Sequence, residues 1–492
     1  MEKKIYFLLA PIFLELPNKI KKNLEDDGFK INISGLVSGS KKDFKKSQIF
    51  FNNVKFLNDL EKKFLSTKYD LLKVQRFREM FGDEVLNNII IADRNLGQGY
   101  VTGSEKFPTK LAKFMQKDNL APIIYVVELL DFLLNEFKNL KPDFIFCYAI
   151  AGAPSLAIAI VAKYLGIKFA TFVHTRVQDR VNLDTSHDFS LQLIAKKYRD
   201  NSDKDIKIGN EAAKYLQNYR NSPIKPSYED VNEKLFYESN SYLNFFKNVT
   251  RFVYHKFKSL FINESFHQSH KNIYLKLKAT LKIKFQNNVF DKVNLKNKFV
   301  YFPLHVDPEA STMVMSPMHT DQISIIEAIS KSVPFDTFVY VKEHIYMWGK
   351  RPKDFYNKIK SFPKVKLVHP LEKNFFLIKS AFAVTTITGT SGWEGMLLKK
   401  PVIFFGNSPF LALNKGFILC KGLSNLPSIF KNLDNFEYCN DEDLLKYLTI
   451  LFENSFSMSH ELLWGDKNRS LAIKKNNQTI QRISDEFKKF LR

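Results

Sequence analysis

Short apolar runs that alternate with longer amphipathic stretches constrain the fold of this chain most. In the second half, apolar runs of strand length occupy residues 298–305, 336–344, 365–369, 381–387 and 401–406. In the first half, they occupy residues 4–10, 87–93, 143–149 and 168–174, and a long helical pattern spans residues 121–140. Strands that alternate with helices are typical of parallel sheets. The pattern therefore predicts an α/β fold.

The length and composition set the number of domains and the compartment. A chain of 492 residues with 45% hydrophobic residues is too long for one ordinary core, and it predicts two or three globular domains. Its three cysteines, Cys147, Cys420 and Cys439, are scattered and form no paired spacing. This indicates a reduced, cytoplasmic protein without a cysteine metal site.

Two apolar segments raise the question of a leader or a membrane span. Residues 1–17 have a basic start and a short apolar run, but Glu15 follows quickly and no small-residue cleavage site is present, which favours a first core strand. Residues 144–162 carry no charge, yet Gly152-Ala153-Pro154 interrupts them. This interruption predicts a buried strand, a turn and a buried helix in place of a membrane span.

Positive charge is concentrated between the two halves. The net charge is +23, and residues 241–300 hold 12 Lys and Arg, two acidic residues and twelve aromatic residues. Residues 241–262 place apolar side chains at helical spacing with basic residues between them. A basic aromatic helix fits an anionic membrane surface, but a linker helix packed on the domains fits equally well. No nucleic-acid-binding motif accompanies the charge, and we expect no nucleic acid partner.

Polar residues follow the predicted strands of the second half at the point where each strand ends. They are His305 and Glu309, then Lys342 and His344, then His369, and finally Thr388, Thr390, Ser391 and Glu394. Parallel strands end at one edge of a sheet, where ligands of open α/β sheets bind. A helix start with hydroxyls, a lysine and a histidine predicts an anion site.

Each of these groups also has a structural explanation when it is taken alone. A histidine at a strand end is more often a structural residue than a catalytic one. Ser391 is a candidate N-cap for the following helix, and Glu394, three residues later, would complete a capping box. Four groups on neighbouring strand ends favour the shared anion site over four separate structural roles.

Several of these motifs resemble a known family. Residues 302–312 (FPLHVDPEAST), 340–344 (YVKEH), 349–352 (GKRP) and 386–406 (TITGTSGWEGMLLKKPVIFFG) resemble the bacterial capsule and surface polysaccharide biosynthesis glycosyltransferases, which include enzymes that transfer Kdo and related acids. The resemblance covers about residues 298–410. It implies a GT-B fold, in which two Rossmann-like domains face a cleft and the C-terminal domain holds the nucleotide.

The resemblance suggests a division of the chain. We expect an acceptor-side Rossmann-like domain at residues 1–200, a basic helical insertion at 201–297, a nucleotide-sugar-binding domain at 298–465 and a C-terminal helix at 466–492.

The K-x-H element also resembles that of bacterial GT-B sialyltransferases. The resemblance implies that Lys342 and His344 hold the phosphate of a CMP-sugar together with hydroxyls of the helix start (Thr388, Thr390 and Ser391), and that Glu394 binds the ribose. His369 is a further nucleotide-side candidate. The family element continues with proline, whereas Ile345 stands here, so the geometry of base recognition departs from the pattern.

A transferase of this kind needs a base and a group that binds the acidic sugar. Asp93, in the tripeptide Ala92-Asp93-Arg94, is the first candidate for the base, and its structural alternative is an N-cap or a partner of Arg94. His305 and Glu309 are competing catalytic candidates. Arg176 and Arg180 are candidates for the donor carboxylate, unless they are surface residues.

These residues predict a metal-independent glycosyltransferase without a cofactor. A protonated Lys342 and His344 would stabilise the departing CMP, because a monophosphate leaving group needs no bridging cation. We expect a sialic-acid-like or Kdo-like donor sugar, a glycan or glycolipid acceptor and a peripheral position at the inner face of the cytoplasmic membrane. The alternatives are a transferase that uses a UDP-sugar, a GDP-sugar or CDP-glycerol, and a non-catalytic capsule assembly protein.

Overall fold

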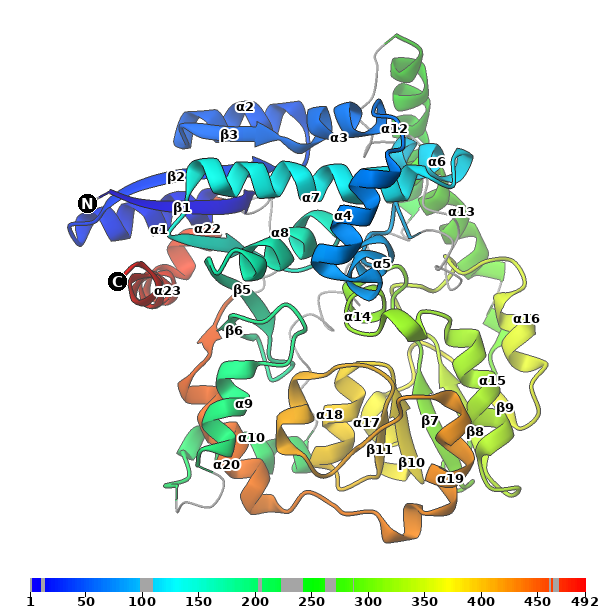
Figure 1. The fold of residues 1–492 in the computed structure, drawn as a ribbon. Helices are drawn as coiled ribbons and strands as arrows, with labels where there is room; N and C mark the ends of the chain where they lie inside the picture. The colour runs from blue at the N-terminus through cyan, green and yellow to red at the C-terminus, as the bar shows by residue number, and fades with distance from the viewer. Residues whose placement is uncertain are drawn as a thin grey trace.

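The protein contains two sheets, each covered by helices (Figure 1). The computed structural model describes residues 2–9, 14–97, 109–201, 206–222, 242–261, 271–285, 287–459, 462 and 469–492. Within these residues, the two sheets have seven and six strands.

The first sheet has the strand order β13-β6-β5-β4-β1-β2-β3. Its strands are β1 (Glu2–Leu9), β2 (Lys30–Val37), β3 (Asn53–Phe56), β4 (Phe144–Cys147), β5 (Lys168–His174), β6 (Arg180–Asp184) and β13 (Phe456–Ser457). Strands β1 to β5 pair in parallel, whereas β6 pairs antiparallel with β5 and β13 antiparallel with β6. Because β1 lies between β2 and β4, the chain leaves the sheet in opposite directions on the two sides of this point.

Helices cover both faces of the first sheet. They are α1 (Glu15–Asp26), α2 (Lys41–Phe50), α3 (Leu57–Leu65), α4 (Leu71–Phe81), α5 (Asp83–Ala92), α6 (Lys110–Lys117), α7 (Ala121–Leu140), α8 (Ala153–Tyr164), α22 (Arg469–Lys475) and α23 (Asn477–Leu491). One core lies between the sheet and α3, α4, α5, α7 and α8, and the other lies under α1 and α23. In the second core, Phe487 packs within 5.1 Å of Phe144 and Phe146, measured between ring centroids.

The second sheet is entirely parallel, with the strand order β12-β11-β10-β7-β8-β9. Its strands are β7 (Phe299–Pro303), β8 (Phe338–Lys342), β9 (Val365–Val368), β10 (Ala383–Thr386), β11 (Val402–Phe404) and β12 (Ile418–Leu419). The helices around it are α14 (Ala310–Met313), α15 (Gln322–Ser332), α16 (Phe355–Lys360), α17 (Asn374–Ser380), α18 (Thr390–Leu397), α19 (Leu426–Lys431) and α20 (Asp441–Glu453). This is the strand order of a Rossmann domain, and its direction reverses between β7 and β10.

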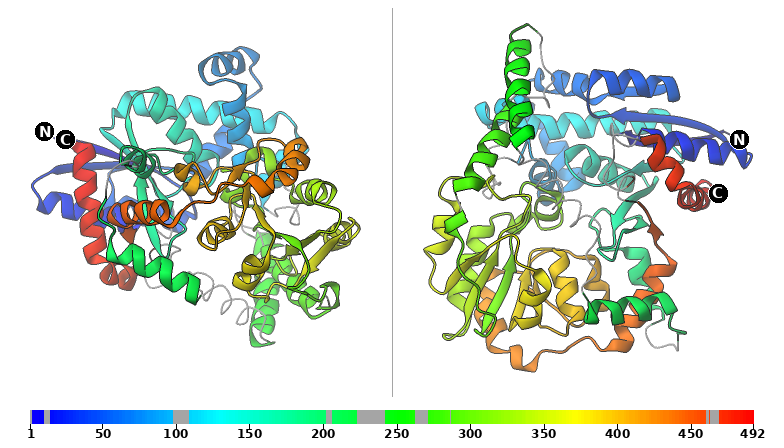
Figure 2. Two further views of the ribbon diagram at one scale, coloured as in Figure 1. Left: turned by 90° about the horizontal axis from the view of Figure 1, so that it is seen from below. Right: turned by 180° about the vertical axis from the view of Figure 1, so that it is seen from behind.

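The chain crosses between the two sheets more than once. Helices α9 (Gln192–Arg199) and α10 (Asn210–Asn221) pack in the core of the second sheet, where Trp393 Nε1 donates to the Tyr215 hydroxyl at 3.2 Å. Helices α12 (Tyr242–Phe261) and α13 (Lys271–Phe285) follow and pack on each other. After α20, strand β13 returns to the first sheet, and α23 ends beside the N-terminus (Figure 2). The division at residues 200, 297 and 465 stays a proposal.

The structure confirms the predicted α/β fold class: two Rossmann-like halves in the GT-B arrangement. Five strands predicted in the second half are present as β7 to β11, and the helix predicted at 121–140 is α7. Residues 144–162 form strand β4 and part of helix α8, and the N-terminal apolar run is strand β1. Within the described residues, the longest apolar helices fall short of what a membrane span requires.

One predicted strand is wrong. Residues 87–93 were predicted as a strand but form the end of α5, which starts with Asp83 and Glu84. Ile89 and Ala92, three residues apart, face the same core. A short isoleucine run fits either structure, and the acidic first turn is what favours the helix.

Candidate functional site

The reversal point of the second sheet lies between the loops that follow β7 and β10. Strand β7 is bonded to both β8 and β10, so these two loops leave the sheet side by side while their helices cover opposite faces. The first loop carries His305 and the second leads into α18. Open α/β sheets bind ligands at such a point.

The His305 side chain joins the two loops. Its Nε2 lies 3.4 Å from the backbone nitrogen of Thr388, which donates to it, and 3.4 Å from Thr386 Oγ1. Thr388 Oγ1 in turn donates to the Ser311 carbonyl at 2.9 Å. Burial, helped by Arg176 and Arg351, lowers the pKa of His305 to about 3. His305 is therefore neutral at pH 7, and its accepting nitrogen is occupied by the turn before α18.

A buried ion pair lies behind the loops after β7 and β8. Arg351 donates to Glu343 through Nε at 3.0 Å and Nη2 at 2.9 Å, and both side chains are almost fully buried. Glu343 also accepts from the His344 backbone nitrogen at 2.6 Å and from the Tyr356 hydroxyl at 2.8 Å. Arg351 Nη2 donates to the His305 carbonyl at 2.8 Å. The pair thus fixes the backbone of both histidines.

His344 lies at the end of β8, beside Lys342. Its Nδ1 accepts from the Tyr346 backbone nitrogen at 3.2 Å, so the proton of the neutral ring is on Nε2. Burial, followed by the charges of Lys342 and Arg351, lowers the pKa of His344 to about 3. The prediction that His344 is protonated is therefore wrong for this structure. The neutral ring offers an N–H donor.

His369 follows the end of β9, the strand next to the one that carries Lys342. Its ring packs edge-on against Trp348 at 4.9 Å and Phe290 at 4.8 Å between centroids. Burial lowers the pKa of His369, a nearby carboxylate at Glu372 opposes the shift, and the charge of Lys342 adds to it. His369 and Lys342 are thus close to each other at neighbouring strand ends.

The N-terminus of α18 does not have the predicted cap. Its N-cap is Gly389, which has no side chain to cap the helix and whose backbone nitrogen donates to Thr386 Oγ1 at 3.0 Å, and Thr390 begins the helix. Ser391 lies inside the helix and Glu394 one turn later, so the capping-box explanation of Ser391 and Glu394 is wrong. Gly392 lets the helix approach the sheet, because a Cβ there would lie 2.2 Å from the Phe404 ring. The start of α18 thus presents its positive end beside His305.

Asp93 lies at the corresponding reversal point of the first sheet. Its Oδ2 accepts from the Ala153 backbone nitrogen at 3.2 Å, where α8 begins after β4, and its Oδ1 accepts from the Asn95 backbone and side chain at 2.8 and 3.1 Å. The carboxylate therefore sits on the positive end of α8. Helix α5, which Asp93 ends, contacts α14 of the second half. The reversal points of the two sheets approach each other here.

The two arginine candidates have different surroundings. Arg176 Nη2 lies 3.9 Å from Met315 Sδ, so this first-half residue reaches the loop after α14. Arg180 is buried, and it donates to Ser455 Oγ at 2.8 Å, to the Phe452 carbonyl at 2.7 Å and to Glu211 at 3.2 Å. Arg180 thus holds β6 to the end of α20, away from the loops that carry the histidines.

The remaining candidate, Glu309, precedes α14. Its side chain is exposed, and Oε2 accepts from Ser311 Oγ at 2.6 Å. The residues that sequence reasoning missed are the buried ones, Glu343, Arg351 and Tyr356. The sequence offered one signal for them: Glu343 and Arg351 stand inside the K-x-H and GKRP motifs. Only the fold brings these residues together.

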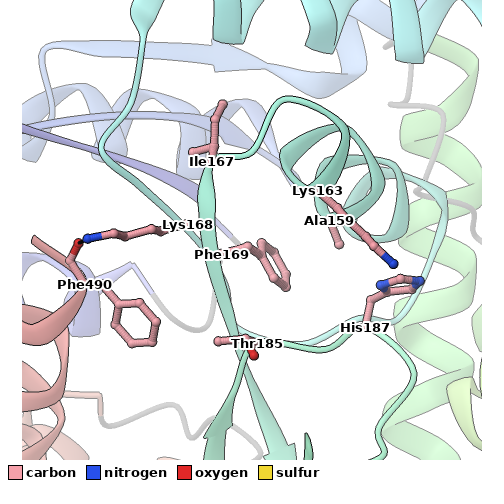
Figure 3. A pocket seen from close by; sticks show the side chains of 8 residues that line it. All are labelled: Ala159, Lys163, Ile167, Lys168, Phe169, Thr185, His187 and Phe490. Carbon is pink, nitrogen blue, oxygen red and sulfur yellow. Dashed lines mark hydrogen bonds between the residues drawn. The ribbon is translucent and has the colours of Figure 1, made fainter. Parts of the chain in front are cut away.

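A separate surface hollow of about 270 Å³ lies elsewhere (Figure 3). It is lined by Lys168 and Phe169 at the start of β5, by Thr185 and His187 after β6, and by Phe490. Lys168 Nζ donates to the Phe490 carbonyl at 2.7 Å. The hollow lies at the edge of the first sheet where β5 begins. The loops that carry His305 and His344 follow the ends of β7 and β8 in the second sheet, so the hollow is separate from them. Within the described residues, no three His, Cys, Asp or Glu side chains gather closely enough to hold a metal ion.

Residues 204–413 match the family model described as "Capsule polysaccharide biosynthesis protein". These residues include all four motifs on which the sequence resemblance rests. Residues 204–413 are thus similar to this family, over less than half of the chain. The matched residues include His305, Lys342, His344, Arg351 and the start of α18, whereas Asp93 and Arg176 lie before them.

Solved structures with related folds are distant. The β-Kdo 2,7 transferase KpsC of Thermosulfurimonas dismutans is 12% identical, with 67% of this chain and 82% of that chain covered and a TM-score of 0.31. A UDP-GlcNAc 2-epimerase of Methanocaldococcus jannaschii is 14% identical over 92% of this chain and 99% of that one, with a TM-score of 0.28. Likenesses of this size carry no functional inference. No curated protein matches the chain.

The buried pair makes a prediction about stability. Arg351→Met leaves the Glu343 carboxylate buried without its cation, and we expect it to cost about 3–5 kcal/mol of unfolding free energy. Urea unfolding followed by circular dichroism measures this loss. Arg351→Met with Glu343→Gln should regain much of it, because no unpaired charge remains.

Arg78→Met is the matched control for this experiment. Arg78 forms a two-point ion pair with Asp83 on the surface, and water screens such pairs. Its urea midpoint should stay that of the native protein. Equal losses for Arg78→Met and Arg351→Met would contradict the role assigned to the buried pair.

Proposed function

We propose that this chain is a glycosyltransferase that moves a sialic-acid-like or Kdo-like sugar from a CMP-activated donor to a surface glycan. The observation that carries the proposal is the uncapped start of α18, which lies beside His305 at the reversal point of the second sheet, with Lys342 and His344 on the adjacent strand end. A helix N-terminus, hydroxyls, a cation and an N–H donor suit one phosphate group.

In this proposal the CMP phosphate binds at the start of α18. Thr390 and Ser391 supply hydroxyl and backbone donors, Lys342 supplies a charge, and His344 donates from Nε2. Glu394, one turn into the helix, is proposed for the ribose hydroxyls. His369 lies on the same edge, against Trp348, and is proposed for the side of the base. His305 positions the turn.

The donor sugar is proposed to lie between the two halves. Its carboxylate would face Arg176, which reaches across from the first sheet to Met315. Arg180 does not enter the proposal, because its guanidinium group is bonded to Ser455, Phe452 and Glu211.

The proposed step needs a proton acceptor on the acceptor side. Asp93 would take the proton of the acceptor hydroxyl as its oxygen bonds to the anomeric carbon and the bond from that carbon to the phosphate oxygen breaks. Charge then develops on the departing CMP, where Lys342 and the His344 N–H stabilise it. No cofactor enters this step.

The asymmetry between the two helix starts supports these roles. The positive end of α8 already faces the Asp93 carboxylate, whereas the N-cap of α18 is a glycine, whose missing side chain cannot cap the helix. An added phosphate is therefore favoured at α18 and disfavoured at α8. The proposal also includes a glycan or glycolipid acceptor and a peripheral position at the inner membrane face, which the net charge of +23 favours.

Nucleotide binding tests the proposal. At a concentration of about 100 times Kd, a ligand stabilises the native state by about 2.7 kcal/mol, and we expect CMP and CDP to raise the melting temperature while UMP, UDP and GDP do not. Lys342→Met should abolish the shift, and Lys331→Met, on the exposed face of α15, should not.

The other outcomes are informative too. A shift with UDP or GDP alone would replace the CMP donor by another nucleotide sugar. If no nucleotide shifts the melting temperature, a non-catalytic role in capsule assembly becomes the better explanation.

A further inference from the structure

Helix α12 exposes a row of apolar side chains. Phe246, Val253 and Phe257 are 65%, 61% and 65% exposed, respectively. Their spacing of seven and four residues places them on one face of the helix. Tyr254, at the edge of this face, is 61% exposed. Large apolar side chains gathered on one exposed helix face mark an interaction surface.

The charges beside this row select the partner. Lys247 and Lys256 are exposed on the two sides of the apolar row, Arg251 is exposed farther round the helix, and α12 contains no acidic residue. The opposite side of the helix is packed, since the Phe252 ring lies 6.2 Å from Tyr274 of α13. An apolar face with basic edges is complementary to an anionic lipid surface, in which the rings enter the interface and the cations meet headgroups.

Helix α13 connects this surface to the loop after β8. Ala279 and Thr280 of α13 are buried. At Gly349, which has a φ of +79°, a Cβ would lie 2.5 Å from the Ala279 carbonyl oxygen. Lys282 Nζ donates to the Arg351 carbonyl at 2.9 Å. Helix α13 therefore packs directly on the loop that carries Arg351. Figure 1 shows α13 reaching the second half of the chain.

The same loop holds the candidate nucleotide site in place. The Arg351 side chain bonds to the His305 carbonyl and to Glu343, and Glu343 accepts from the His344 backbone nitrogen. A continuous series of contacts thus runs from α12 through α13 and Arg351 to both histidines.

We propose that α12 binds an anionic membrane surface and that α13 transmits this binding to the nucleotide loop, so that lipid and CMP bind cooperatively. The coupling rests on the proposed function, because it needs CMP at His344. Lipid contact fixes α12 and α13, and the Gly349 and Lys282 contacts then hold the loop in its binding geometry. By linkage, CMP tightens lipid binding by the same factor.

The test uses the full chain with vesicles of phosphatidylcholine, with or without phosphatidylglycerol. We expect sedimentation of the protein with the anionic vesicles only, and CMP affinity, measured by calorimetry, to rise about fivefold or more when they are present. Phe246→Ser with Phe257→Ser should abolish vesicle binding and keep the lipid-free CMP affinity. Phe335→Ser is the matched control, because Phe335 is 98% exposed in the loop before β8.

Variants of Lys282 test the coupling between the two sites independently of lipid binding. Lys282→Met removes the bond to Arg351, and it should leave the sedimentation with anionic vesicles unchanged while the vesicle effect on CMP affinity is lost. Lys282→Arg keeps a donor and should restore the effect.

Several results would overturn the inference. They are equal binding to both vesicle types, vesicle binding that survives the double serine variant, a double serine variant that only dissociates a dimer, and a CMP affinity that anionic vesicles leave unchanged. If CMP fails to bind with and without vesicles while α12 still binds anionic lipid, the proposed function has failed and the membrane surface stands.

Discussion

Asp93→Asn is expected to lower sugar transfer by about 10²–10⁴-fold while CMP affinity stays near that of the native protein. Asparagine has nearly the same shape and keeps one carbonyl oxygen to accept from Ala153, but it cannot take a proton from the acceptor hydroxyl. Transfer is measured as CMP release from CMP-activated acids, with the sugar product followed by mass spectrometry. CMP affinity is measured separately by calorimetry.

The control for Asp93 must loosen the same turn without removing the carboxylate. Ser155→Ala does so, because Ser155 Oγ accepts from the Ala151 nitrogen and donates to the Gly152 carbonyl, both at 3.0 Å. We expect this variant to retain most of its transfer activity. Equal losses in both variants would show that Asp93 acts by holding the start of α8. Weaker CMP binding in Asp93→Asn would show that the nucleotide binds the first half, which contradicts the proposal.

His344→Ala is expected to lower turnover by about 10²–10³-fold, the usual effect of removing one donor that faces developing charge. Burial and neighbouring cations keep His344 neutral, so the loss comes from its Nε2–H and not from a positive charge. His344→Gln can still donate an N–H, and it should retain more activity than the alanine variant.

The fold of His344→Ala should remain intact, because the backbone nitrogen of residue 344 still donates to Glu343. Its circular dichroism spectrum and urea midpoint are the readouts. Near-native turnover in a folded His344→Ala variant would remove this residue from the mechanism.

The fold was predictable because the signals were local. The runs around β7 to β11 are apolar, short and each followed by polar residues, so their strand assignment needed no knowledge of the rest of the chain. The run at residues 87–93 was misassigned because three isoleucines fit a strand or a helix equally well. Strand β2 was missed because Asn32, Ser34 and Gly35 interrupt its apolar pattern.

The candidate site was predictable only in part. Only Glu343 separates Lys342 from His344 in the sequence, and the place of both residues at a strand end follows from the pattern. The protonation of His344 did not follow, because it depends on burial and on Arg351, seven residues away. Arg176 and Arg180 have different surroundings because they contact Met315 and Ser455, respectively. These partners are distant in sequence and meet the arginines only in the folded chain.

The return of the chain to the first sheet has a consequence for biosynthesis. Strand β13 and helix α23 supply an edge strand and the Phe487 side chain to a core that begins with strand β1. A nascent chain therefore carries an unfinished first half through the synthesis of the entire second half, with Phe144 and Phe146 still lacking their contact with Phe487. Cutting the chain between the two halves would not release two independent units, and a chaperone that shields aromatic surface would be of most use during that interval.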